Sequence, residues 1–320
     1  MRHNGLTRKR FASTGPEEAT LQQQRQKATT QGSATDPYQY NPVSRRSLLI
    51  SAAVIGAGNI LGAAAPSAAQ DAGKPKPQVL ALIGDRFHNS DYIRVSLDRL
   101  FSELGLPIDY TVLYDQLSRD RLRGYRILIC LRDGMIWPGG YLGPDAYTCY
   151  ADGLENAEDF PKPQPKNWIT QEQAEAVRDF VAQGNGLYSL HNNSHVSVTS
   201  PTYREVMGGA YIGHPPLRPF KVRVVNKGHP ITQGIEDFMV NDEQHYVTYD
   251  KDHQNILLEA ENVDGLAYED HGTKSISGWA HEYGKGRVVF TAVGHSIHAM
   301  WAPEYLKLQK RAVQWLLKMI

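Results

Sequence analysis

The fold is decided by residues 78–85, which read QVLALIGD. Five consecutive apolar residues, Val79 to Ile83, are followed at once by Gly84 and Asp85. A continuous apolar run of this length is typical of a strand buried on both faces, as the strands of parallel sheets are. We therefore expect a parallel sheet covered by helices, with polar residues where its strands end.

The rest of the chain continues this pattern. Ile93, Leu97 and Leu100 recur at helical spacing and Gly105 ends that helix. Further strands are predicted over 108–113, 126–131, 186–190, 220–225, 247–249, 256–259 and 287–293, and further helices after the capping signals Thr170, Ser200-Pro201 and Pro303. This order predicts one doubly wound α/β domain, with a mainly parallel sheet and helices on both faces.

Composition excludes several classes of protein. The 320 residues include 41% hydrophobic residues, enough to bury a full core without disulfide or metal support. The 34 Lys and Arg balance 34 Asp and Glu, and eight of the basic residues fall in residues 1–69. Residues 70–320 are therefore mildly acidic. They lack the basic surface that nucleic acids need, and no nucleic-acid partner is expected.

The first seventy residues predict export. Residues 1–43 have no apolar periodicity, and we expect a disordered extension. Arg45 and Arg46 precede an apolar run to Leu61 and the small residues of 63–69, which is the pattern of a twin-arginine signal peptide over 44–69. A linker over 70–78 and a domain over 79–320 follow. The expected partner is the twin-arginine translocation machinery, and the expected location is periplasmic or secreted. The alternative is an uncleaved segment that anchors the protein in the membrane.

Export also bears on the two cysteines. Cys130 lies in the apolar strand over 126–131, where a small buried residue is the usual interpretation. Cys149 falls in a segment rich in Pro, Gly and Tyr, and an exported protein would allow the two thiols to pair. That segment, residues 132–168, is long enough to predict a lid or a binding loop.

Histidines and acidic residues follow several of the predicted strands, His214 follows a small-residue turn, and Asp242 with Glu243 lies between Phe238 and His245. Because parallel strands end at the same edge of a sheet, ligands bind there, and we expect these side chains to share one pocket. The candidates for acid/base catalysis are His88, His191, His214, Glu243 and His295, with Glu243 at the pocket's edge. Neutral imidazoles with a carboxylate suit a divalent metal such as Zn²⁺, or alternatively a proton relay. The metal ligands would be His88, His191, His214 and His295.

Other polar and aromatic residues are assigned different roles. Asp85, Asn192, Trp137 and Trp301 are candidates for substrate binding, the two tryptophans by stacking on sugar rings. His229 with Pro230 indicates a turn, and His214 follows an expected turn over 208–211. We expect His253, His271 and His281 to be exposed.

Several stretches together resemble the trehalose-utilisation (ThuA-like) family. They are the strand leading to His88, the residues 180–191, which read FVAQGNGLYSLH, the residues 207–214, which read MGGAYIGH, His229 to Thr232, Asp242 with Glu243, and 279–295. The resemblance implies a flavodoxin-like, class I glutamine amidotransferase-like fold over residues 79–320. It also implies a role in carbohydrate metabolism, with a carbohydrate or a keto-sugar derivative as the small-molecule partner.

Two function classes remain open. The first is an enzyme acting on sugars, a hydrolase, lyase or isomerase. The second is a non-catalytic sugar-binding protein that uses the same pocket. Glutaminase chemistry is disfavoured, because the fold's amidotransferases carry a cysteine at a sharp strand-to-helix turn and neither Cys130 nor Cys149 has that setting.

Overall fold

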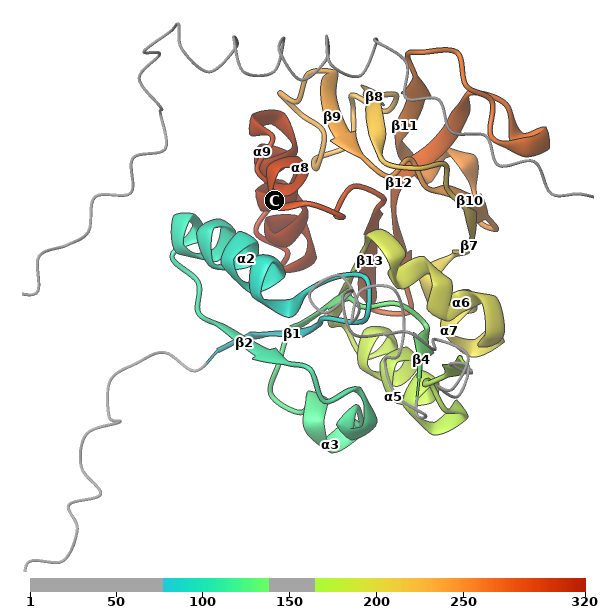
Figure 1. Cartoon of the computed structure of the whole chain (residues 1–320). Helices are drawn as coiled ribbons and strands as arrows, with labels where there is room; N and C mark the ends of the chain where they lie inside the picture. The colour runs from blue at the N-terminus through green and yellow to red at the C-terminus, as the bar shows by residue number, and fades with distance from the viewer. Residues whose placement is uncertain (1–76, 138–164) are drawn as a thin grey trace, which may run out of the picture. The chain divides into compact units, whose positions relative to one another are not determined.

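The computed structural model describes residues 77–137 and 165–320, which belong to one compact unit. A large central sheet runs through it (Figure 1). In spatial order its nine strands are β2 (Ile108–Thr111), β1 (Val79–Ile83), β3 (Ile127–Leu131), β6 (Gly186–Leu190), β13 (Gly286–Thr291), β12 (Lys274–Tyr283), β11 (Ile256–Asn262), β8 (Arg218–Val224) and β9 (Phe238–Asp242). Two small sheets pair β7 (Gly209–Gly213) with β10 (Tyr246–Tyr249), and β4 (Met135–Ile136) with β5 (Lys166–Asn167).

The central sheet has two halves. From β2 to β13 all neighbours are parallel, as the buried apolar runs predicted. From β13 to β9 all neighbours are antiparallel. The α/β prediction with a flavodoxin-like, doubly wound half is confirmed, and the antiparallel half makes the whole sheet more mixed than the sequence pattern indicated.

Helices cover both faces of the parallel half. One face carries α2 (Ser90–Leu104), α8 (Ile297–Met300) and α9 (Pro303–Leu316). The other carries α3 (Arg119–Leu122), α5 (Gln171–Ala182), α6 (Val196–Thr199) and α7 (Pro201–Met207) (Figure 1). Short 3-10 turns lie at η1 (Tyr114–Gln116), η4 (His191–His195), η5 (His253–Asn255) and η6 (Glu269–His271).

Side chains of β1 alternate between the two layers. Val79, Ala81 and Ile83 pack in the core beneath α2 and α9, whereas Leu80 and Leu82 pack beneath α5 and α7. All five are at most 2% exposed, so the strand is buried on both faces, as its apolar run predicted.

Capping residues set where the helices begin and end. The Thr170 hydroxyl and the Gln173 side chain form the reciprocal capping box expected at the start of α5. Ser200 caps α7 through the backbone N–H of Tyr203. Gly105 ends α2 with φ of 66°, a left-handed conformation that costs glycine little. These three sequence predictions are confirmed.

Two predictions are wrong, and β7, β9 and β12 were not among the predicted strands. Residues 208–211 do not form a turn, because Gly209 starts β7, which pairs with β10 and so brings its backbone against Thr248. The ten-residue strand β12 was not predicted, since Gly278 and scattered polar residues interrupt its apolar pattern. His281 was expected to be exposed, but it is buried, because it lies on β12 inside the sheet. Its Nε2–H donates to the Val206 carbonyl at 2.9 Å.

Some predictions fall on residues outside the described ranges. They concern the disordered extension, the signal peptide, most of the linker, Cys149 and most of the loop over 132–168. Cys130 is a buried free thiol on β3. Within residues 77–137 and 165–320, no helix is long and apolar enough to span a membrane.

Candidate functional site

A cavity opens at the carboxyl edge of the parallel strands. Its volume is about 530 Å³, within the range of about 300–1,000 Å³ typical of small-molecule sites. The strands end at one level because their registers match: Ile83 pairs with Leu131, Cys130 with Ser189, and Leu190 with Thr291. Most of the residues that line it have polar side chains: Arg86, Phe87, His88, Asp133, Met135, Asn192, His195, Tyr211, His214, Glu243, His245 and His295.

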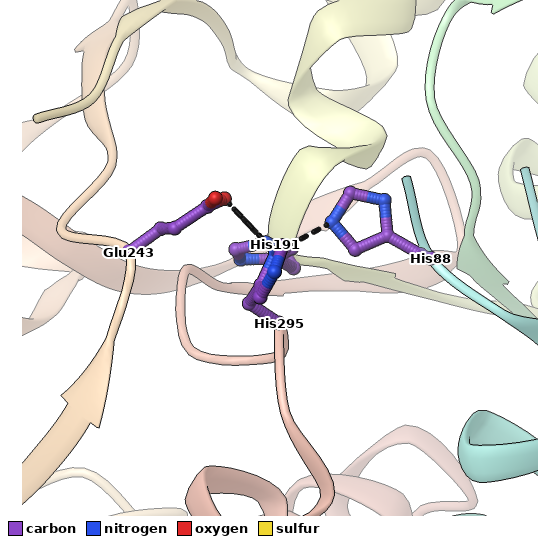
Figure 2. A group of neighbouring side chains, drawn as sticks. All are labelled: His88, His191, Glu243 and His295. Atoms are coloured by element: carbon purple, nitrogen blue, oxygen red, sulfur yellow. Dashed lines mark hydrogen bonds and ion pairs between the residues drawn. The ribbon is translucent and has the colours of Figure 1, made fainter. Parts of the chain in front are cut away.

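Four side chains meet beside this cavity, and we call them the primary cluster: His88, His191, Glu243 and His295 (Figure 2). Three of them line the cavity, whereas His191 is fully buried behind the lining. His88 follows β1, His191 directly follows β6, His295 follows β13, and Glu243 directly follows β9. One ligand atom from each lies within 4.8 Å of the others. Four residues predicted as catalytic therefore lie together, although they span more than 200 positions of sequence.

The distances within the primary cluster are short. Glu243 Oε2 lies 3.1 Å from His295 Nδ1 and 3.4 Å from His191 Nε2. His295 Nδ1 also lies 3.2 Å from His88 Nε2. Four ligands about 2.0 Å from a tetrahedral Zn²⁺ would lie about 3.3 Å from one another. Three of the contacts in the cluster already have this spacing.

Asp85 orients His88. The ring nitrogen Nδ1 of His88 lies 2.9 Å from Asp85 Oδ1, and Asn192 Nδ2 donates to Asp85 Oδ2 at 2.8 Å. Burial alone would raise the pKa of Asp85, but hydrogen bonds from His88, Asn192 and the Asp133 backbone outweigh it and lower the pKa to about 2. Asp85 thus holds Nδ1 of His88, and Nε2 of the same ring faces the cluster.

His191 is oriented by the backbone. Its Nδ1–H donates to the Ala292 carbonyl at 2.7 Å, so Nε2 carries the lone pair and points at Glu243. Burial lowers the pKa of His191, which keeps the ring neutral. His191 also has a φ of 52°, a left-handed conformation that costs a non-glycine residue about 1–2 kcal/mol. Such strain is often found at functional positions.

Glu243 is charged among these rings. Burial would raise its pKa, but contacts with His191, His245 and His295 outweigh burial and lower it. The pKa of His295 shifts the other way: burial lowers it, and the Glu243 carboxylate more than compensates and raises it. Protonated His295 can thus form an ion pair with the Glu243 carboxylate. Neutral His191 instead faces this carboxylate with the lone pair of Nε2, which is not a hydrogen-bond donor.

His214 joins the site through a second group. Its Nε2 lies 3.6 Å from Glu243 Oε2, and His245 Nε2 lies 3.5 Å from the same oxygen. We call His214, Glu243 and His245 the secondary cluster. His214 therefore groups with Glu243 and His245. The predicted ligand set had placed it with His88, His191 and His295.

Asp133 and His195 form another wall of the cavity. His195 Nδ1 lies 3.5 Å from Asp133 Oδ1. Burial raises the pKa of Asp133 to about 7 and lowers the pKa of His195. Neither of them was a predicted site residue, and nor were Tyr211 and His245. His245 had a usable signal, because its two-residue spacing from Glu243 matches the period of extended chain.

The predicted substrate-binding residues have different environments. Asn192 lines the cavity, whereas Asp85 lies behind His88 and supports it. Trp137 packs edge-on against Phe87, with a ring distance of 5.5 Å. Trp301 lies under the Arg99 guanidinium of α2 at 5.0 Å. Neither tryptophan is among the residues that line the cavity. Stacking of a sugar on them therefore has no support from the cavity lining.

The fold and the site define a class of protein: flavodoxin-like α/β proteins with imidazoles and a carboxylate at the strand ends. A family model described as "ThuA: Trehalose utilisation" matches residues 88–316, which include every residue of both clusters. The chain belongs to the ThuA family, as the sequence stretches indicated. Membership supports a sugar-related role.

Solved structures agree with this fold. A ThuA-like protein from Bacteroides uniformis superposes with a TM-score of 0.54 at 16% identity, over 77% of this chain and 95% of that chain. Another, from Parabacteroides merdae, gives a TM-score of 0.53 at 14% identity, over 75% and 90%. At these identities the likeness concerns the fold. A comparison with curated protein sequences finds no match.

Proposed function

We propose that this protein is an exported enzyme that acts on a carbohydrate, in particular a keto-sugar derivative, in the cavity at the strand ends. The observation that carries the proposal is the convergence of the primary cluster in a cavity of about 530 Å³. Proton transfer to or from a sugar needs positioned groups that can change protonation near neutral pH, and imidazoles with a carboxylate supply them.

The cavity lining favours an enzyme over a non-catalytic binding protein. A binding groove for sugars is expected to offer broad aromatic surfaces for stacking. Phe87 and Tyr211 are the aromatic residues in this lining besides histidines, and both lie among titratable groups. Glutaminase chemistry has no support either, because burial raises the pKa of the Cys130 thiol to about 12. The reaction classes proposed are hydrolysis, elimination or isomerisation of a sugar.

The primary cluster also fits a divalent metal such as Zn²⁺. The buried Nε2 of His191 has no hydrogen-bond partner and faces an ionised carboxylate, so two electron-pair donors point at each other. A cation between them would relieve this repulsion. Asp85 and the Ala292 carbonyl hold the outer nitrogens of His88 and His191, an arrangement common around metal-bound histidines. His88, His191, Glu243 and His295 would hold the ion, and its positive charge would stabilise negative charge that develops on a nearby oxygen of the sugar.

Turnover of oxidised sugars tests the proposal. The purified protein is incubated with keto-disaccharides and with the parent disaccharides, and products are followed by mass spectrometry. Loss of a catalytic acid or base typically costs about 100-fold or more, so His191→Ala and His295→Ala should lose turnover to that extent. His271→Ala, on the exposed turn η6, is the control. Unchanged turnover in both cluster variants would remove the catalytic role and leave the sugar-binding alternative.

Export is part of the proposal. Arg45 and Arg46 directly before an apolar run support the twin-arginine route to the periplasm or the exterior. Gly56, Gly58 and Gly62 interrupt that run and weaken the alternative of a permanent membrane anchor.

A further inference from the structure

His214 and His245 converge on the carboxylate that the primary cluster already uses. Their Nε2 atoms lie 3.6 and 3.5 Å from Glu243 Oε2. Within the described residues, the ligand atoms of the primary and secondary clusters form two groups that share Glu243 alone. In both clusters the histidine contacts of Glu243 are to the same oxygen, Oε2, and a carboxylate oxygen has about two lone-pair sites, so this oxygen can lie between two neighbouring cations.

One histidine ring of the primary cluster stacks on one of the secondary cluster. The rings of His191 and His245 lie 4.0 Å apart at 24°, and both direct Nε2 toward Glu243 Oε2. Two parallel rings that each held an ion at Nε2 would hold the ions at a separation close to the ring spacing. Paired metal ions in catalytic sites lie about 3.5–4 Å apart. The spacing of the rings therefore matches that of a two-metal centre.

The ring nitrogens of His245 have no hydrogen-bond partners. The residue is 2% exposed, and both Nδ1 and Nε2 are buried. A buried polar atom without a partner costs about 1–3 kcal/mol, and native proteins rarely leave one so. The orphaned Nε2 points toward the carboxylate of Glu243, as that of His191 does.

We propose that the site holds two divalent cations bridged by Glu243, the second of them bound by His214 and His245. This inference rests on the metal assigned to the primary cluster under the proposed function. Four protein ligands fill that first position, whereas His214, His245 and Glu243 leave the second one open. Catalytic zinc sites usually have three protein ligands and an open position for water or substrate. The second ion is thus the one that meets a sugar carbonyl or its neighbouring hydroxyl.

Charge in the region is compatible with two cations. Glu243 lies between the two clusters, and Asp85 lies behind His88 with its Oδ1 2.9 Å from the ring nitrogen Nδ1. Asp242 accepts from the backbone N–H groups of Glu243, Gly294 and His295 beside the cluster. The cavity itself is lined by Asp133 as a further carboxyl group. Arg86 is the one permanently cationic side chain in the lining of the described cavity.

Zinc stoichiometry of the full-length chain tests the inference. The protein is stripped with a chelator, loaded with Zn²⁺, passed through a desalting column and analysed for bound zinc. We expect two ions per chain in the wild type and fewer than two in His214→Ala. His245→Asn should have the same effect, and His214→Ala keeps the test available if the buried position does not tolerate replacement. His195→Ala, which lines the cavity but belongs to neither cluster, should retain two ions.

Each result separates the two proposals. One ion in the wild type, unchanged in His214→Ala, would overturn the second position and leave the first. Two ions in the wild type and in both variants would also overturn it, because the extra ion would bind elsewhere. No bound zinc would overturn both metal assignments. Anomalous diffraction at the zinc edge gives an independent readout, with two peaks about 3.5–4 Å apart expected beside Glu243.

Discussion

Asp242 binds the backbone of Gly294: its Oδ2 accepts the Gly294 N–H at 2.7 Å. The same carboxylate accepts the N–H of His295 at 3.1 Å and, through Oδ1, that of Glu243 at 3.0 Å. Asp242 ends β9, the outermost antiparallel strand, whereas Gly294 follows β13 of the parallel half. One buried side chain thus connects the two halves of the sheet and fixes the backbone of two residues of the primary cluster.

Replacement of Asp242 by Asn should weaken metal binding without removing a ligand. The amide has one acceptor oxygen, so it cannot accept all three N–H groups, and the loop with His295 loosens. Loss of such supporting contacts typically costs about 10–100-fold in metal affinity. Competition with a chromogenic chelator measures Zn²⁺ affinity. Asp270→Asn on the exposed turn η6 is the control, and an Asp242→Asn protein that is folded and binds zinc like the wild type would contradict this role.

Gly294 should be intolerant of a side chain. A Cβ at this position would lie 2.7 Å from His191 Cβ and 3.2 Å from His191 Cγ. His191 has little freedom to move away, because its ring is held by the Ala292 carbonyl. Gly294→Ala should therefore destabilise the fold by about 1–3 kcal/mol, as overpacking usually does, and weaken Zn²⁺ binding.

Urea unfolding measures the stability part of that prediction. Gly228→Ala is the matched control, because the nearest atom to its added Cβ would be Asn226 Oδ1 at 3.8 Å. Equal unfolding midpoints for the two glycine variants would show that the close approach to His191 is relaxed at little cost.

The parallel half of the fold was predictable, and so was most of the primary cluster. Buried parallel strands such as β1 have continuous apolar runs, and their ends must share one edge. His191 follows such a run directly, and His88 and His295 follow within five residues, which is why the sequence indicated them. Glu243 and His214 follow antiparallel strands instead, and the sequence pointed to them through the family resemblance and their residue types.

The remaining features depend on tertiary contacts that leave little local signal. β12 carries Gly278 and several polar residues, and it is a strand because β11 and β13 pair with it on both sides. His281 lies on β12, so the burial of His281 could not be predicted while this strand was not. The spacing of His245 from Glu243 was a local signal, but the stacking of its ring against His191 joins segments more than fifty residues apart and could not be predicted from the sequence.

Export should depend on both arginines of the signal. The twin-arginine receptor is expected to read the side chains of Arg45 and Arg46, and Lys keeps the charge but not the planar guanidinium. The Arg45→Lys, Arg46→Lys double variant should accumulate unprocessed in the cytoplasm, measured by fractionation and immunoblotting. Arg8→Lys, Arg10→Lys, in the extension before the signal, is the control. Normal export and processing of the signal variant would exclude this route.

Buried His281 should make the fold less stable in mild acid. Burial lowers the pKa of His281 to about 4, against about 6.5 in the unfolded chain. Between these values the unfolded chain binds a proton that the folded chain does not, so the free energy of unfolding falls as the pH falls. The stabilisation is complete above about pH 6.5, and about 3 kcal/mol of it is lost by pH 4.

The difference between wild type and His281→Gln isolates this effect. Gln can still donate to the Val206 carbonyl, as His281 Nε2 does, but it does not titrate. Urea unfolding at several pH values between 7 and 4, in the presence of a chelator, should give a steeper loss of stability for the wild type than for the variant. His271→Gln, at an exposed position, should follow the wild type. Parallel curves for wild type and His281→Gln would mean that this ring is protonated in the folded protein as easily as in the unfolded chain.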